Sequence, residues 1–201
     1  YENAKLIITT SKYSVNYLKN MFPNLKNKIF KVNLSIDCKR FKIKKKSNLI
    51  TYMPRKLPDH SNLLLFYLKN LLPKNWKILP LINVSEKKLT KSLSISKIFL
   101  SFSNFEGMGI PPIEAAISGN KVIGYVGGGG SEYWKKPIFI KVENGEIADF
   151  AKKILNNIKN YKTSWLKDTK KDRLLLSNYY SLKSEKKSLI LLSNKILKFF
   201  D

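Results

Sequence analysis

The chain has 201 residues, of which 43% are hydrophobic and 12% aromatic, a composition that supports a buried core and excludes a disordered tail. It carries 38 lysine and arginine residues against 14 acidic residues, which gives a formal net charge of +24. The single cysteine, Cys38, excludes an internal disulfide bond and a cysteine-based metal cluster. The first residue is Tyr1 and not methionine, so we expect a fragment of a longer protein.

The positive charge raises the hypothesis of a nucleic-acid partner, but the kind of basic residue argues against it. Only Arg40, Arg55 and Arg173 are arginines, and all other basic residues are lysines. Recognition of base edges relies on the planar fork of arginine, so we expect no nucleic-acid partner. The lysines are spread along the whole chain, as compositional drift in an AT-rich genome would produce. A lysine-rich face attracted to anionic lipid remains the alternative.

No part of the sequence has the pattern of a signal peptide, and no apolar run approaches the ~18 residues of a membrane span. The longest apolar stretches are short, such as residues 189–192. We therefore expect a cytoplasmic protein, with peripheral association at the inner face of the membrane left open.

Short apolar stretches alternate with amphipathic ones in the first part of the chain. Residues 4–11 predict a buried strand that ends in a helix cap, and residues 11–22 predict an amphipathic helix. Residues 28–37 predict a second strand, the lysines at 42 and 44–46 mark a solvated connector, and residues 48–56 predict an apolar strand that runs into a loop at Pro54.

The alternation of strand and helix from residue 48 to residue 160 predicts an α/β fold, a Rossmann-like doubly wound parallel sheet with helices on both faces. Ligands bind outside the carboxyl ends of the strands in such sheets, so the loops after residues 53, 102 and 126 form the candidate site. The elements expected after residue 60 are a helix at 61–72 ended by Pro73, strands at 76–82 and 96–102 separated by a helix around 85–94, a helix over 112–118, a strand at 121–126, a helix at 145–160 and two further helical stretches.

Two glycine-rich loops follow predicted strands, and neither matches a nucleotide-binding fingerprint. Gly107-Met108-Gly109 lacks the third glycine of the dinucleotide motif, because Pro112 stands in its place. The run of glycines at 127–130 lacks the Lys-Ser/Thr pair of a P-loop. A nicotinamide-dinucleotide enzyme and a P-loop ATPase are therefore not supported, and each loop alone also fits a tight turn after a strand.

Together the two loops predict a ligand that carries both phosphate and sugar. They expose backbone N–H groups at strand ends, and one of them opens a helix, where anions are favoured. Arg55 follows a third strand and is expected at the same edge of the sheet. The carboxylates of Glu106 and Glu114 flank the first glycine loop and are suited to accept hydrogen bonds from sugar hydroxyls.

The segment "SFSNFEGMGIPPIEAAISGNKVIGYVGGGGSEYW" resembles the donor-binding half of GT-B-fold glycosyltransferases that carry a Glu-(seven residues)-Glu motif. "AKLIITTS", "LSID" with Phe41, and "YMPRK" resemble upstream parts of the same enzymes more loosely, so the resemblance covers about residues 3 to 160. It implies that residues 1–45 are the end of an N-terminal acceptor domain and a connector, 46–180 a nucleotide-sugar-binding domain, and 181–201 a C-terminal helix.

The resemblance also implies roles for individual residues. Glu114 matches the glutamate that binds the ribose hydroxyls, Glu106 matches the one near the donor sugar, and Arg55 matches the arginine on the diphosphate. Cationic side chains and a helix end do the work of a metal in this family, so no metal or cofactor is expected, only a nucleotide-diphosphate sugar as the donor substrate. The candidate catalytic residues are Arg55, Lys56 and Glu106, and the candidate donor-binding residues are Gly107, Met108, Gly109, Ile110, Glu114, Gly128 and Gly129.

One position departs from the family pattern. The family places a lysine six residues beyond the arginine, and Ser61 stands there in this chain. Lys56 is the first candidate to replace that lysine, and His60 is the second. His60 also fits a plain role as a polar residue before the start of a helix.

The expected function is that of the donor-binding domain of a glycosyltransferase in polysaccharide or glycoconjugate synthesis, with retention of configuration and an unidentified acceptor. We expect the fragment to bind a nucleotide diphosphate without metal and to be inactive alone. A degenerate module that binds a nucleotide or a partner without turnover is the alternative, supported by Ser61. Leu189, Leu192, Ile196 and Phe200 share one helical face, which predicts packing toward the missing domain or a homodimer.

Overall fold

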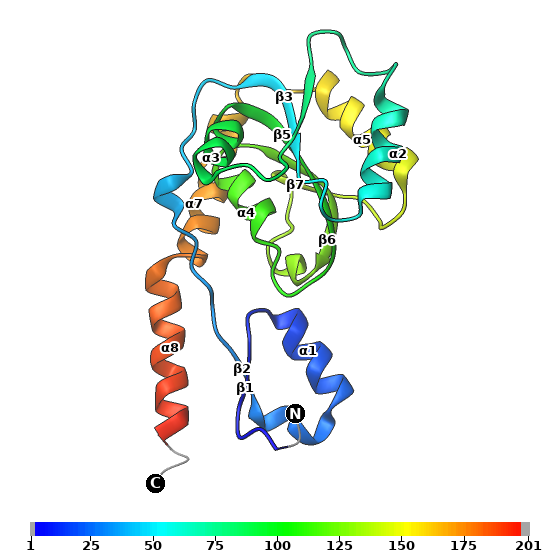
Figure 1. Cartoon of the computed structure of the whole chain (residues 1–201). Helices are drawn as coiled ribbons and strands as arrows, with labels where there is room; N and C mark the ends of the chain where they lie inside the picture. The colour runs from blue at the N-terminus through cyan, green and yellow to red at the C-terminus, as the bar shows by residue number, and fades with distance from the viewer. Residues whose placement is uncertain (1–2, 198–201) are drawn as a thin grey trace.

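The computed structural model describes residues 3–197 and contains two parallel sheets (Figure 1). The larger sheet has five strands in the order β4-β3-β5-β6-β7, and each neighbouring pair is parallel. The predicted parallel α/β fold is confirmed. The strands are β3 (Ser47–Tyr52), β4 (Lys77–Pro80), β5 (Ser96–Glu106), β6 (Lys121–Gly128) and β7 (Phe139–Lys141), the last of which the sequence analysis missed.

Helices cover both faces of the larger sheet (Figure 1). Alternate side chains of β5 join two separate cores: Phe99 packs in the cluster that includes α4, and Ile98 and Leu100 pack in the cluster that includes α2 and α5. All three are at most 2% exposed, as expected for a central parallel strand. The helices are α2 (Pro58–Leu68) and α5 (Ile147–Lys159) on one face, and α3 (Glu86–Ile95), α4 (Ile110–Ile117), the short α6 (Trp165–Asp168) and α7 (Lys170–Tyr179) on the other.

The strand order reverses between β3 and β5. From β3 the chain moves outward to β4 and then returns to place β5 on the opposite side of β3. Counted from β3, this is the 2-1-3-4-5 order of a doubly wound sheet, in which ligands bind at the reversal. The topology alone therefore predicts a ligand site at the carboxyl ends of β3 and β5.

A small unit at the N-terminus lies below the larger sheet in Figure 1. β1 (Ile7–Thr9) and β2 (Ile29–Lys31) pair in parallel, and α1 (Lys12–Met21) and the 3-10 helix η1 (Pro23–Lys28) connect them. A connector with the short helix η2 (Cys38–Arg40) leads to β3. The proposed domain boundaries after residues 45 and 180 remain predictions.

The last helix, α8 (Leu182–Leu197), runs from the sheet back to this N-terminal unit (Figure 1). Ser35 Oγ donates to Glu185 Oε2 at 2.6 Å, and Lys195 Nζ donates to the carbonyl oxygen of Asn27 at 2.9 Å. Of the predicted apolar face, Leu192 is buried, Leu189 and Ile196 stay exposed, and Phe200 lies outside the described residues. None of the helices within residues 3–197 combines the length and the apolar character needed to cross a membrane.

Some local predictions were wrong in detail. α2 begins at Pro58, three residues before the predicted start, so His60 and Ser61 lie inside the helix. Leu57, the N-cap residue of α2, has a left-handed backbone conformation with φ 49°, which no local sequence rule predicts for leucine. The strand expected over 28–37 is confined to the three residues of β2.

The lysine at the end of the predicted solvated connector is not solvated. Lys46 is half-buried, and its Nζ donates to the carbonyl oxygen of Leu93 at 3.1 Å and to that of Ser118. These carbonyls lie at the ends of α3 and α4, where a cation is favoured. Burial, with a smaller effect of Arg173, lowers the pKa of Lys46 to about 7.

We expect Gly124→Ala to destabilise the sheet by at least about 3 kcal/mol. Gly124 has φ +139°, and a Cβ there would lie 2.1 Å from the carbonyl oxygen of Ser101 on the neighbouring strand β5. Gly145→Ala is the matched control, because Gly145 also has a positive φ (+90°) but no atom lies within 4 Å of the added Cβ. It should cost only the backbone strain of ~1–2 kcal/mol. Equal losses in urea unfolding would contradict the predicted backbone clash.

Candidate functional site

A cavity of about 840 Å³ lies at the carboxyl ends of β3, β4 and β5, where the strand order reverses. It is lined by the loop after β3 (residues 53–56), the loop after β4 (81–84), the end of β5 and the start of α4. We call it the first cavity. Its volume falls in the ~300–1,000 Å³ range of small-molecule sites.

The structure brings the three candidate catalytic residues to the first cavity. Lys56 Nζ forms an ion pair with Glu106 Oε1, and the two side chains are 38% and 16% exposed. Arg55 is exposed, and within residues 3–197 its guanidinium has no ion pair or hydrogen bond. Arg55 is therefore available to an anionic ligand, whereas Lys56 already has a carboxylate partner.

The start of α4 adds backbone donors to the same cavity. Gly109 is the N-cap residue of α4, with φ +72°, and Met108, Gly109 and Ile110 all line the cavity. The carbonyl oxygen of Gly109 accepts a hydrogen bond from Tyr133 Oη at 2.7 Å, and a Cβ at Gly109 would lie 2.9 Å from that hydroxyl. Glycine is thus required at a turn that exposes the first N–H groups of a helix, a favourable position for an anion.

Glu114 occupies a different position from the other acid. It is the fifth residue of α4, in the second turn, whereas the predicted helix start at residue 112 would place it in the first turn, and it does not line the first cavity. Its carboxylate is half-buried, and burial raises its pKa, while the charge of Arg40 acts in the opposite direction. Arg40 itself forms an ion pair with Glu86, at the start of α3.

The remaining predicted glycines hold the two glycine loops together. A Cβ at Gly129 would lie 2.0 Å from the carbonyl oxygen of Gly107, so the two backbones are in direct contact. A Cβ at Gly128, where φ is +75°, would lie 2.6 Å from the ring of Tyr13 in α1. These glycines do not line the first cavity; they fix the loops around it.

Lys56 and His60, the two candidates to replace the lysine that is absent at Ser61, differ in their position relative to the first cavity. Ser61 is completely buried in α2, and its Oγ donates to the carbonyl oxygen of Pro58 at 2.8 Å. His60 Nδ1 lies 3.1 Å from Tyr125 Oη, and its ring packs edge-on against the same tyrosine. Neither lines the first cavity, so Lys56 is the candidate that does.

Sequence reasoning missed the loop after β4. Residues 81–84 line the first cavity, and Asn83 has a positive φ of 45°, a sparsely populated conformation for a residue other than glycine. The signal was the topology: β4 neighbours β3, so its carboxyl end reaches the same edge of the sheet.

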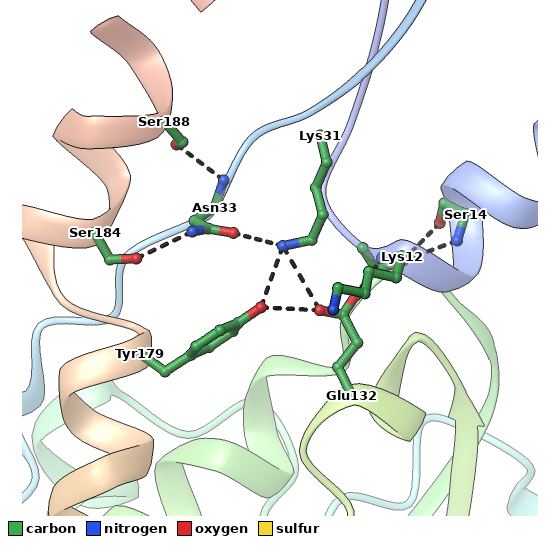
Figure 2. A network of polar contacts seen from close by, with 9 residues as sticks. Lys12, Ser14, Lys31, Asn33, Glu132, Tyr179, Ser184 and Ser188 are labelled. Atoms are coloured by element: carbon green, nitrogen blue, oxygen red, sulfur yellow. Dashed lines mark hydrogen bonds and ion pairs between the residues drawn. The ribbon is translucent and has the colours of Figure 1, made fainter. Parts of the chain in front are cut away.

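One buried carboxylate joins the N-terminal unit to the sheet (Figure 2). Glu132, at the end of the short helix η3 (Gly129–Glu132), accepts a hydrogen bond from the backbone N–H of Lys12 at the start of α1. Its Oε2 accepts from Tyr179 Oη at 3.1 Å and lies 3.6 Å from Lys31 Nζ in β2. The side chain of Glu132 is only 7% exposed, so these partners compensate for its desolvation.

The same contacts extend to the C-terminal helix (Figure 2). Lys31 Nζ also donates to Asn33 Oδ1. The Nδ2 atom of Asn33 donates in turn to Ser184 Oγ at 3.0 Å. The backbone N–H of Asn33 donates to Ser188 Oγ at 3.0 Å. Glu132 is therefore the centre of a polar network that links α1, β2, α7 and α8 to the loop after β6.

No protein-family model matches the chain, and no curated protein matches it either. Solved structures do. S. aureus TarM, in a complex with fondaparinux, alpha-GlcNAc-glycerol and UDP, aligns with a TM-score of 0.74 and 19% identity over 95% of this chain and 44% of its own. A glycosyltransferase from Rickettsia africae aligns with a TM-score of 0.73 and 18% identity over 96% of this chain and 64% of its own. Anabaena HepE, in a complex with UDP and glucose, aligns with a TM-score of 0.75 and 13% identity over 94% of this chain and 63% of its own.

These neighbours are GT-B glycosyltransferases, and the likeness shows that this chain has the fold of one Rossmann-like GT-B domain. The chain spans about half to two thirds of the length of these neighbours. At such low identity the likeness concerns the fold, and the first cavity has to be interpreted from its own residues.

We expect Glu132→Ala to lower the free energy of unfolding by about 3 kcal/mol, because it leaves the hydroxyl of Tyr179 and the N–H of Lys12 without their acceptor and removes the ion-pair partner of Lys31. Asp149→Ala is the control: Asp149 pairs with Lys153 at 2.7 Å across one turn of α5, and the two side chains are 40% and 36% exposed. That substitution should cost less than about 1 kcal/mol. Urea unfolding of both variants checks the difference, and a loss at Glu132 as small as the control's would contradict the network's role.

Proposed function

We propose that this chain is the nucleotide-sugar-binding part of a GT-B glycosyltransferase that acts, with retention of configuration, in polysaccharide or glycoconjugate synthesis. The observation that carries the proposal is the first cavity: an arginine that has no ion pair among residues 3–197, a lysine–glutamate pair and the N-terminus of α4 meet where the strand order reverses. TarM and HepE, which share the fold, have been solved with UDP, and HepE also with UDP-glucose.

In this proposal the diphosphate lies between Arg55 and the first N–H groups of α4. Both carry positive charge toward the cavity, and both stabilise negative charge that builds on the diphosphate as its bond to the sugar breaks. The planar guanidinium suits two phosphate oxygens at once. Lys56 supplies a second cation, and its ion pair with Glu106 holds both side chains at the cavity wall.

Glu106 and Glu114 are proposed to bind sugar hydroxyls, with the donor sugar at Glu106 and the ribose at Glu114. Glu106 lines the first cavity directly, which supports the first assignment. Glu114 lies on the same helix that begins at the cavity, one turn further along. A desolvated carboxylate is costly in the free protein and is stabilised when it accepts hydrogen bonds from hydroxyl groups, which supports a binding role.

Within residues 3–197 no three His, Cys, Asp or Glu residues lie close enough together to hold a metal ion. Binding without a divalent metal remains a prediction, as does the inactivity of the isolated chain. A module that binds nucleotide without turnover is the second candidate, and two observations favour it. Ser61 is buried in α2, and Lys56 is already occupied by Glu106.

Arg55→Ala is expected to weaken UDP or GDP binding by about tenfold, because a charged hydrogen bond is worth roughly 1.5–3 kcal/mol. Binding of the uncharged nucleoside should change little. Lys152→Ala, an exposed cation on α5, serves as the control for the general positive field of the chain. Calorimetric titration of the unsubstituted chain and both variants, with and without a chelator, measures these affinities, and Lys152→Ala should leave them unchanged. An Arg55→Ala variant with unchanged affinity for both diphosphates would exclude the proposed diphosphate site.

Glu114 predicts a ribose preference that depends on pH. At pH 7.5 we expect UDP to bind about tenfold more tightly than 2′-deoxy-UDP, because the ionised carboxylate accepts from the ribose hydroxyls. Burial raises the pKa of Glu114, so protonation reaches it at a higher pH than an ordinary glutamate, and the preference should fall as the pH is lowered to 5. UDP and 2′-deoxy-UDP carry the same diphosphate, so protonation of the phosphate affects both affinities equally and does not change their ratio.

Glu114→Gln is the matched variant for this measurement. It should show a small ribose preference that does not change with pH. Because the raised pKa means that ionised Glu114 destabilises the folded state above its unfolded pKa, the same variant should melt at a higher temperature at pH 7.5 when no ligand is bound. A pH-dependent preference retained in Glu114→Gln would assign the ribose contact to another group.

A further inference from the structure

A second cavity lies beside the first one, at the carboxyl ends of β6 and β7. Its volume is about 550 Å³, and it is bordered by the end of β5, residues 125–128 of β6, residues 141–144 and the start of α1. Ser103 lines both cavities, and the next residues of β5 divide between them, with Phe105 on the second cavity and Glu106 on the first. The proposed function does not use this cavity.

Aromatic residues form much of its border: Tyr13, Phe105 and Trp134, together with Tyr125, whose side chain is only 2% exposed. Phe105 is 66% exposed, yet its ring is held edge-on by Tyr13 at 5.9 Å and by Tyr17 at 5.5 Å. A large apolar ring fixed in an exposed position at the mouth of a cavity offers a face to a ligand, because its own packing leaves that surface unburied.

The walls are fixed before any ligand arrives. Tyr13 packs against the backbone of Gly128, where no Cβ would fit. The residue before it, Lys12, is held through its N–H by Glu132, which anchors the start of α1 to η3 (Figure 2). Tyr125 is buried between Phe102 and Phe150 and meets His60 through its hydroxyl. A preformed site loses little freedom on binding.

The charges at the second cavity cancel. Lys141 and Glu143 are the charged residues that line it within the described chain, and Lys141 Nζ lies 2.7 Å from Glu143 Oε1. The other polar groups at the wall are neutral: Ser103, Asn104, Ser131 and Asn144. The first cavity, in contrast, has Arg55 unpaired. The second cavity therefore suits an uncharged ligand with many hydroxyl groups and not a phosphate.

We propose that the second cavity binds a neutral saccharide. A pyranose ring presents C–H bonds on its faces, which pack on aromatic rings, and hydroxyls around its rim, which match the amide, carboxylate and hydroxyl groups described above. The saccharide is the acceptor of the sugar, a role that rests on the function proposed for the first cavity. In that step an acceptor hydroxyl oxygen bonds to the anomeric carbon, the bond from that carbon to the diphosphate breaks, and the hydroxyl proton leaves on the diphosphate.

Saturation-transfer NMR on the 201-residue chain tests the binding, with maltose, cellobiose and chitobiose as neutral probes and glucuronic acid as an anionic one. We expect saturable binding of at least one disaccharide at millimolar concentration and binding of glucuronic acid that is at least about fivefold weaker. Phe105→Ala and Asn144→Leu, both at exposed positions, should weaken disaccharide binding by about fivefold. Tyr67→Ala, an exposed tyrosine of α2 that lines neither cavity, should leave it unchanged.

UDP titrations of the same proteins separate this inference from the proposed function. Phe105→Ala should retain UDP affinity within about twofold, because the ring does not line the first cavity. Loss of UDP binding in every protein with disaccharide binding intact would overturn the acceptor role and leave the saccharide site standing. Absence of saturable binding for all three disaccharides up to about 50 mM, or equal binding by Phe105→Ala, would overturn the saccharide site.

Discussion

The direct backbone contact between the loop after β5 and the loop after β6 sets the arrangement of both cavities. Gly129 can approach the carbonyl oxygen of Gly107 only because Gly129 has no side chain. The contact fixes the path of residues 107–109, and Gly109 then turns in a left-handed conformation into α4. On the other side it leaves Gly128 open to the ring of Tyr13. One steric requirement thus directs the helix N-terminus into the first cavity and an aromatic ring into the second.

Glu132 follows this contact immediately along the chain, and that position explains why a carboxylate is buried there. The N-terminal unit has a small core of its own, around Ile7, Leu25 and Ile29, so its orientation on the sheet depends on polar contacts together with the packing of Tyr13 and Tyr17 on Phe105. Glu132 accepts hydrogen bonds from α1 and α7 and forms an ion pair with Lys31 in β2. A buried charged network is weak evidence for net stability, so we infer that this one serves to fix a single arrangement of the unit. The geometry of Tyr13 over the glycine loop is the feature that this network determines.

The sequence predicted the parallel sheet and the strand ends that carry Arg55 and Glu106, because strand and helix periodicity is local and the carboxyl-end rule is topological. It did not predict that Lys46 is half-buried, since that depends on carbonyl groups from two helix ends that are distant in the chain. Nor did it predict the lining at residues 81–84, the pairing of Lys56 with Glu106 or the second cavity. Each of these depends on which segments meet in space, which no local pattern records.

The high net charge and the individual sites act on different length scales. A charge of +24 attracts any anion to the surface, but exposed charges are screened beyond about 8 Å at physiological salt, so the overall field cannot select a position. Selection requires a cation that has no internal partner and lies beside oriented N–H groups. The first cavity provides that combination through Arg55 and the start of α4, and the second does not, because Lys141 is neutralised by Glu143. Under the proposed function, this difference would place the charged donor in the first cavity and the neutral acceptor in the second.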